Sequence, residues 1–92
     1  MKIEPVEIYS DASNLAVMRH PGRKHPGSLI QGDSLSILVQ EAKDLCAAIE
    51  SSGDEELIAL AQTHLDKLEG RLATYEKALL EHGMELPYTR RA

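Results

Sequence analysis

The pattern of apolar and polar residues predicts a helical second part of the chain. From Ser34 onward, apolar residues recur at spacings of three and four, which is the period of one face of a helix. The positions in this first stripe are Leu35, Leu38, Ala42, Leu45 and Ile49. Asp33 or Ser34 is expected to be the N-cap, because a short side-chain oxygen accepts hydrogen bonds from the free amides of the first turn.

A second helix is predicted after the segment ESSGDEE. Gly53 is typical of a helix C-terminus, and Asp54 followed by Glu55 and Glu56 is typical of the next N-terminus. The same spacing then continues for longer, and this helix is expected to end near His82 and Gly83. Its apolar positions are Ile58, Ala61, Leu65, Leu68, Leu72, Tyr75 and Leu79.

The two predicted helices have unequal lengths. At about 1.5 Å per residue, the first spans about 27 Å and the second about 42 Å. About two turns of the second helix, including Leu79 and Leu80, therefore have no partner within the hairpin. Packing on the N-terminal segment of the same chain is the favoured expectation, and packing on a second subunit or on a bound protein is the alternative.

The first 33 residues contain three short apolar runs. In PVEIYS, Val6 and Ile8 alternate with polar-facing positions, as in a half-buried strand. NLAVMR fits either a strand or a helix turn, and Val17 with the following His-Pro favours an extended run. SLIQG is the third candidate strand. We therefore predict an α+β fold, in which two or three short antiparallel strands pack on a C-terminal antiparallel helical hairpin with a longer second helix. Residues 1–92 are expected to form a single domain, with strands and a basic loop in 1–33, the hairpin in 34–83 and a tail in 84–92.

Length and composition set the class of protein. Ninety-two residues suit one small domain, and its core must be aliphatic because Phe and Trp are absent. The single cysteine, Cys46, permits no internal disulfide and is predicted to be a buried, inert thiol. No apolar run suggests a secretory leader or a membrane span, so a cytoplasmic protein without a membrane partner is expected.

Charge is distributed unevenly along the chain. Residues 1–33 hold four basic and four acidic side chains, whereas residues 34–92 hold six basic and eleven acidic ones. The second part therefore supplies the whole net charge of −5. Such a surface repels a phosphate backbone, so nucleic-acid binding is not expected, and it attracts a basic protein partner.

No catalytic or metal-binding set is found in the sequence. Residues 32–35 spell GDSL, the nucleophile block of an esterase and lipase family, but no Asp is followed by His three residues later. The chain is also too short for the fold that such a nucleophile needs. His20 and His25, taken with Asp33, match no compact metal-ligand spacing. The protein is therefore expected not to be an enzyme and to need no metal or other cofactor.

The segment RHPGRKHPG, residues 19–27, concentrates positive charge between two Pro-Gly turns. Turns of this kind curl the backbone, so the side chains could surround a phosphate or carboxylate. A solvated connection, or a loop that forms ion pairs with the acidic hairpin of its own chain, is the other interpretation. The candidate anion-binding or partner-binding residues are Arg19, His20, Arg23, Lys24 and His25.

Three segments, VEIYSDASN, RHPGRKHPG and IQGDSL, resemble a family of small bacterial proteins of unknown function. The resemblance covers about residues 6–38 and brings no activity with it. It implies a bacterial cytoplasmic origin and directs attention to Tyr9, Asn14, Arg19, Arg23, Gln31 and Asp33. In size and acidity the chain is also similar, as a class, to immunity proteins that neutralise bacterial toxins.

Three functional hypotheses follow from these patterns. The first is a small acidic protein-binding module, of the immunity type, that sequesters a basic bacterial partner through hairpin residues Glu55, Glu56, Glu69 and Glu76. The second is a small regulatory module that binds an anionic ligand at the loop of residues 19–27. The third is a homodimer in which the overhanging ends of the second helix pair.

Overall fold

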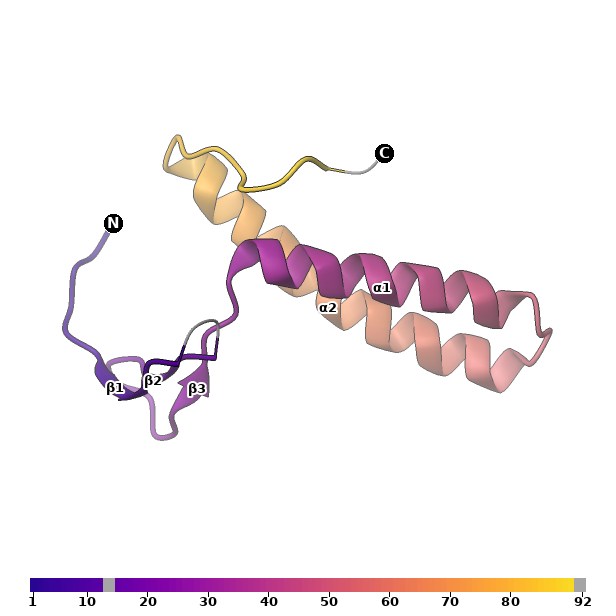
Figure 1. The fold of residues 1–92 in the computed structure, drawn as a ribbon, viewed down its shortest axis with the longest axis horizontal. Helices are drawn as coiled ribbons and strands as arrows, with labels where there is room; N and C mark the ends of the chain where they lie inside the picture. The colour runs from indigo at the N-terminus through magenta and orange to yellow at the C-terminus, as the bar shows by residue number, and fades with distance from the viewer. Residues whose placement is uncertain (13–14, 91–92) are drawn as a thin grey trace. The chain divides into compact units, whose positions relative to one another are not determined.

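The computed structural model describes residues 1–12 and 15–90, and contains three strands followed by two helices (Figure 1). The strands are β1 (Glu7–Ser10), β2 (Val17–Arg19) and β3 (Gly27–Ser28). The helices are α1 (Gly32–Glu50) and α2 (Glu55–Glu81). The predicted α+β order and the longer second helix are confirmed. The chain divides into two compact units, Met1–Gln31 and Gly32–Ala92, and a single domain stays a prediction.

The first unit is a small antiparallel meander in the order β1-β2-β3. Glu7 lies opposite Arg19, and the register shifts between Ile8 and Ser10, as in a β-bulge. Its side chains are mostly exposed, and among its described residues Ala16 alone is buried, at 7% exposure. The sheet therefore has almost no apolar core within the unit.

The third predicted strand, SLIQG, is wrong over most of its length. The strand is only Gly27–Ser28, which pairs with Met18 and Val17. One further hydrogen bond follows, in which the Leu29 amide donates to the Ala16 carbonyl at 2.9 Å. The chain leaves the sheet after this bond, because α1 begins only three residues later at Gly32.

The start of α1 also corrects the prediction. Gly32 is the first helical residue rather than the end of a strand, so Asp33 lies inside the first turn. The Asp33 carboxylate accepts a hydrogen bond from the Ser34 amide at 2.8 Å, and its negative charge suits a helix N-terminus. Gly32 is buried, and a Cβ at this position would overlap the ring of Tyr75 on α2. The glycine therefore lets α2 approach the first turn of α1.

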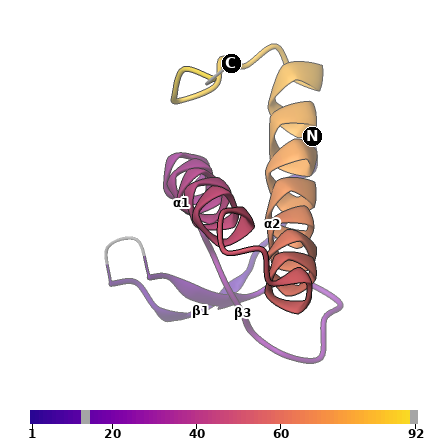
Figure 2. The same cartoon turned by 90° about the vertical axis from the view of Figure 1, so that its right-hand side faces the viewer.

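The turn between the helices forms as predicted; Figure 2 looks onto this end of the hairpin. Gly53 has a φ of 72°, in the left-handed region that favours glycine. Asp54 is the N-cap of α2, and its carboxylate accepts from the Glu56 amide at 3.1 Å and the Leu57 amide at 3.2 Å. The sequence ESSGDEE thus ends one helix and starts the next.

The core of the second unit lies between α1 and α2. Its buried members are Val39, Ala42, Cys46 and Leu65, with Ala61, Leu68 and Leu72 packed against them. The predicted stripe of α2 is therefore confirmed around Leu65. Cys46 is a buried free thiol, also as predicted.

The predicted stripe of α1 is wrong at two positions. Leu38 and Leu45 remain 44% and 56% exposed, whereas their neighbours Val39 and Cys46 are buried. The sequence offers two adjacent apolar stripes on this helix. The buried one is built from smaller side chains, which allow the helices closer approach, and it leaves the larger leucines outside.

The end of α2 is as predicted, and the tail that follows it contacts the helix. His82 is the C-cap, Gly83 has a φ of 68°, and the Met84 amide donates to the Leu79 carbonyl at 2.9 Å. The following segment then returns along α2 and passes α1 (Figure 1). The chain's own C-terminal tail therefore contacts α2 at Glu76, which the sequence did not predict. Packing of the overhang on the N-terminal segment, on a second subunit or on a bound protein stays a prediction.

Candidate functional site

The turn end of the hairpin is uniformly acidic. The 23 residues from Asp44 to Asp66 contain no Lys or Arg. All of their acidic side chains are exposed, and none forms an ion pair with the parts of the chain that the structure describes. These residues are Asp44, Glu50, Asp54, Glu55, Glu56 and Asp66. The region therefore carries six negative charges that form no ion pair within residues 1–12 and 15–90.

Large apolar side chains are exposed at the same end of the hairpin. Leu45 is 56% exposed on the last two turns of α1, and Leu57 and Leu60 are 47% and 69% exposed on the first two turns of α2. Leu57 and Leu60 lie three residues apart and so share a helix face. We call these leucines, with the six acidic residues, the turn-end surface. Scattered exposed leucines need no explanation, but three within a run that also holds six exposed carboxylates form a candidate interface.

The four predicted partner-binding glutamates do not lie together. Glu55 and Glu56 belong to the turn-end surface, where they also favour the N-terminus of α2. Glu69 lies more than three turns away, with an oxygen 3.9 Å from the Lys43 ammonium. Glu76 is further along α2 and is bound by the tail. Only the first two of these carboxylates are therefore available to a partner without competition.

The tail residues Tyr88 and Arg90 both contact Glu76. The Tyr88 hydroxyl donates to Glu76 Oε2 at 2.8 Å, and the Arg90 Nε lies 3.5 Å from the same oxygen. Burial, followed by the hydrogen bond to Glu76, raises the pKa of the Tyr88 hydroxyl well above its ordinary value. A cavity of about 500 Å³ is lined by α1, α2 and the tail residues Tyr88, Thr89 and Arg90. Sequence reasoning missed this cluster, since no periodicity marks the tail.

The cationic loop of the first unit has one of its arginines already engaged. Arg19 donates to Glu7 Oε1 through Nε at 3.1 Å and also through Nη2, and the Tyr9 hydroxyl donates to Glu7 Oε2 at 2.7 Å. The hydrogen bond from Arg19, and then the one from Tyr9, lowers the pKa of the Glu7 carboxyl. The hydrogen bond to Glu7 raises the pKa of Tyr9. Arg19 is thus committed to a cross-strand pair within the sheet.

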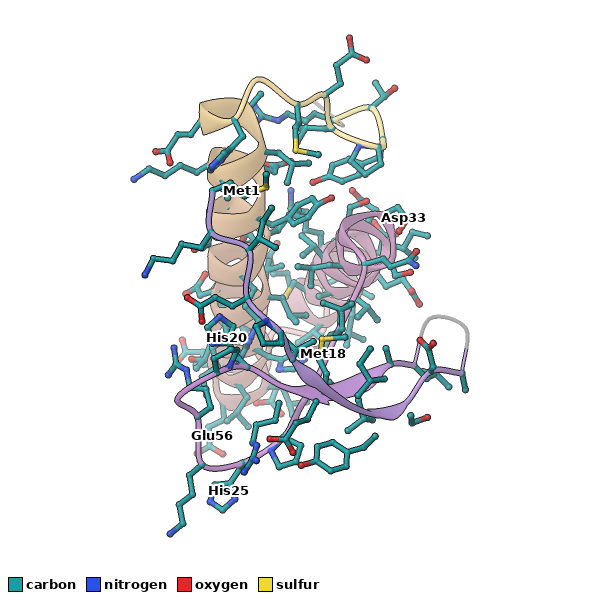
Figure 3. All side chains as sticks on the ribbon, turned by 90° about the vertical axis from the view of Figure 1, so that its left-hand side faces the viewer. Met1, Met18, His20, His25, Asp33 and Glu56 are labelled. Atoms are coloured by element: carbon teal, nitrogen blue, oxygen red, sulfur yellow. The ribbon has the colours of Figure 1, made fainter. Side chains whose placement is uncertain are left out.

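The rest of the loop forms the predicted first turn. Gly22 has a φ of 80°, and the Arg23 amide donates to the His20 carbonyl at 3.1 Å. Figure 3 labels His20 and His25 on this loop. Arg23, Lys24 and His25 are exposed, and Arg23 lines a shallow depression together with Glu7 and Arg19. An anion site here stays a prediction, and it has to rely on Arg23 and Lys24 because Glu7 already binds Arg19.

The remaining motif residues are dispersed. Tyr9 belongs to the Glu7 cluster, Gln31 is exposed just before α1, and Asp33 is exposed in its first turn. Asn14 lies outside the described residues. Across residues 1–12 and 15–90, no three His, Cys, Asp or Glu side chains are grouped so that they could hold a metal ion. No helix in those ranges is long and apolar enough to cross a bilayer.

Comparison with known proteins identifies the family but no activity. A model of a family of unknown function (DUF6959) matches residues 1–88. The chain therefore belongs to this family. No curated protein and no solved structure matches it.

Proposed function

We propose that this member of the family is a protein-binding module whose turn-end surface binds a basic protein. The observation that carries the proposal is the run from Asp44 to Asp66, which holds six exposed carboxylates, three exposed leucines and no Lys or Arg. Unpaired charge of one sign attracts a partner of the opposite sign and accelerates its association. A basic partner with apolar side chains at the centre of its interface fits this surface.

The exposed leucines would contribute binding affinity that the charges alone would not. Burying a leucine side chain contributes about 1.5–3 kcal/mol relative to leaving it exposed, whereas exposed ion pairs contribute about 0–1 kcal/mol each. Leu45, Leu57 and Leu60 would therefore provide most of the affinity. The carboxylates would determine the association rate and the choice of a basic partner.

Helix capping does not account for the whole charge pattern. Asp54 caps α2, and Glu55 and Glu56 in its first turn favour the helix N-terminus. Asp44, Glu50 and Asp66 lie outside that turn, and helix formation does not require the absence of Lys and Arg over 23 residues. A binding role accounts for these additional features.

Sequestration of a basic bacterial toxin is the specific form of this proposal. A toxin whose positive surface is its working surface would be blocked when the acidic turn end covered it. The support for this form is the size and acidity that the chain shares with immunity proteins as a class. The proposal that the turn-end surface binds a basic protein does not require that this protein is a toxin.

The experiment is co-purification from the native host with three forms of the tagged full chain, followed by calorimetry with the purified partner. The first form is the wild type. The second is Glu55→Gln/Leu60→Ser, which removes one charge and one exposed apolar side chain. The third is the control Lys77→Gln/Glu81→Gln, which removes an exposed i,i+4 ion pair far from the turn.

The expected result is a stoichiometric basic protein whose affinity falls at least tenfold with the turn-end variant and is unchanged with the control. Its affinity is also expected to weaken as salt rises, because exposed charges are screened. An acidic partner, or a basic one that binds the turn-end variant as tightly as the wild type, would contradict the proposal.

A further inference from the structure

The strongest remaining feature is the groove between α1 and α2 where the C-terminal tail lies. Its apolar floor includes Val39, Leu72 and Ala73, and its volume of about 500 Å³ lies within the usual range of ligand pockets. The cavity is present with the tail in place, so the tail covers the groove without filling it. This groove shares no residue with the turn-end surface.

The charges of the groove favour a cationic occupant. Glu41, Glu69 and Glu76 line it together with Lys43, so the helices contribute three carboxylates and one ammonium. The remaining cation comes from the tail, as Arg90. Without the tail, the helical walls carry an excess of two negative charges.

Glu76 is the carboxylate that the tail engages. With the tail in place its side chain is 16% exposed, and a carboxylate removed from water to this extent is costly unless hydrogen-bond donors or cations satisfy it. The partners that the described residues provide are the Tyr88 hydroxyl and the Arg90 guanidinium, two positions apart on the tail. The tail thus shows that this groove accepts a phenol hydroxyl and a cationic side chain at Glu76.

The tail is attached in a way that permits release. It follows the glycine that ends α2, and the side chain of Arg90 is 58% exposed. Solvent screens a cation that is this exposed, so the Arg90 contact is weaker than an ion pair whose two partners are both buried. A competing segment has to replace one hydroxyl and one cation at a single carboxylate.

We propose that this groove is a docking site for a protein segment that presents a tyrosine and, two residues later, an arginine or lysine, and that the chain's own tail covers it in the free protein. Glu76 receives both side chains of the incoming segment, and the apolar floor receives the aromatic ring. Because the tail is tethered, it competes at an effective concentration of about millimolar, which weakens binding of outside segments.

The test uses the full chain and fluorescent peptides, with binding followed by anisotropy. The released variant is Tyr88→Ala/Arg90→Ala, and circular dichroism first establishes its helix content. One peptide copies residues 84–90, and a second keeps only its Tyr and Arg at the same spacing in a Gly/Ser/Ala background. Control peptides replace Tyr by Ala, replace Arg by Ala, or move the two residues apart.

The expected result is that both peptides bind the released variant at least tenfold more tightly than the wild type. Glu76→Gln, added to the released variant, is expected to weaken binding at least tenfold, and each control peptide is expected to bind at least tenfold more weakly. Glu55→Gln/Leu60→Ser is expected to leave peptide binding unchanged, which separates this site from the turn-end surface.

Three outcomes would overturn the proposal. The first is loss of helix in the released variant, which would make the tail part of the folded core. The second is binding of the copied peptide but not of the background peptide, which would make the contact a specific structural closure of this chain. The third is equal binding to the wild type and the released variant, which would place the peptide elsewhere.

Discussion

In the hairpin unit, α1 and α2 bury Val39, Ala42, Cys46 and Leu65 against one another, whereas in the sheet unit Ala16 is the one described residue that is buried. The hairpin is therefore stabilised by apolar packing, close helix approach and a cap. The sheet relies on its short ladder and on the surface cluster of Glu7, Tyr9 and Arg19. Because most of the buried apolar residues lie in the hairpin, we expect substitutions in the hairpin core to lower the free energy of unfolding more than substitutions in the sheet.

The largest effect is expected from Leu65→Ala, because Leu65 is 6% exposed at the centre of the hairpin core. Truncating a buried leucine costs about 2–5 kcal/mol in the free energy of unfolding. Chemical denaturation followed by circular dichroism measures the loss. The matched control is Leu60→Ala, which removes a leucine from the same helix at a position that is 69% exposed, and its cost is expected to stay below about 1 kcal/mol.

The second prediction concerns two glycines in helices. Gly32→Ala is expected to lower the free energy of unfolding by about 1–3 kcal/mol, because the new methyl group would overlap the Tyr75 ring. Gly70→Ala is expected to raise it by up to about 1 kcal/mol, because nothing lies within 4 Å of a Cβ there and alanine favours the helix. Denaturant midpoints measure both, and equal signs for the two variants would contradict the close approach of α2 to Gly32.

The third prediction concerns the cap of α2. Asp54→Ala is expected to cost about 0.5–2 kcal/mol, because the Glu56 and Leu57 amides lose the carboxylate that accepts from them. Thermal unfolding measures the loss, and Asp54→Asn, which keeps a capping oxygen, is expected to recover most of it. Equal destabilisation by both variants would show that the negative charge matters more than the hydrogen bonds.

The smallest effect is expected in the sheet and depends on pH. The hydrogen bonds from Arg19 and Tyr9 lower the pKa of Glu7 from its ordinary value of 4.5, so their stabilisation is present above that value. It is lost as pH falls through the lowered pKa of the folded state, since protonation removes the charge that accepts these bonds. NMR titration of the Glu7 carboxyl measures the shift.

The matched variants for this titration are Arg19→Gln and Tyr9→Phe. Arg19→Gln is expected to return the pKa of Glu7 further toward its ordinary value than Tyr9→Phe does, because the Arg19 hydrogen bond is the larger cause of the shift. A Glu7 pKa that is the same in the wild type and in Arg19→Gln would show that the cross-strand pair does not form in solution.

Local signals predicted most of the secondary structure. The turn at ESSGDEE, the stripe of α2 around Leu65 and the stop at Gly83 each depend on residues within a few positions of one another. Period, capping and positive φ are properties of short segments, so they can be recognised from the sequence. The uneven charge of the second half is likewise a property of composition, and it is enough to direct attention to the acidic hairpin.

Contacts between residues far apart in the sequence decided which face of α1 is buried and which glutamates are engaged. On α1, two apolar stripes were equally regular, and the choice of Val39 and Cys46 over Leu38 and Leu45 depended on how closely α2 could pack. That choice also determined which leucines of α1 remain exposed. The division of the four predicted glutamates between the turn-end surface and contacts with Lys43 or the tail came from the same packing.

The sequence by itself determined the order of the elements, the length of the second helix, the helix turn and the acidic character of the hairpin. Only the tertiary structure decided that α1 begins at Gly32, that the tail returns to Glu76 and that Arg19 pairs with Glu7. The physical reason is distance along the chain: Tyr88 and Glu76 are twelve residues apart, and so are Arg19 and Glu7. Such pairs form only when the intervening backbone has folded, so no local pattern records them.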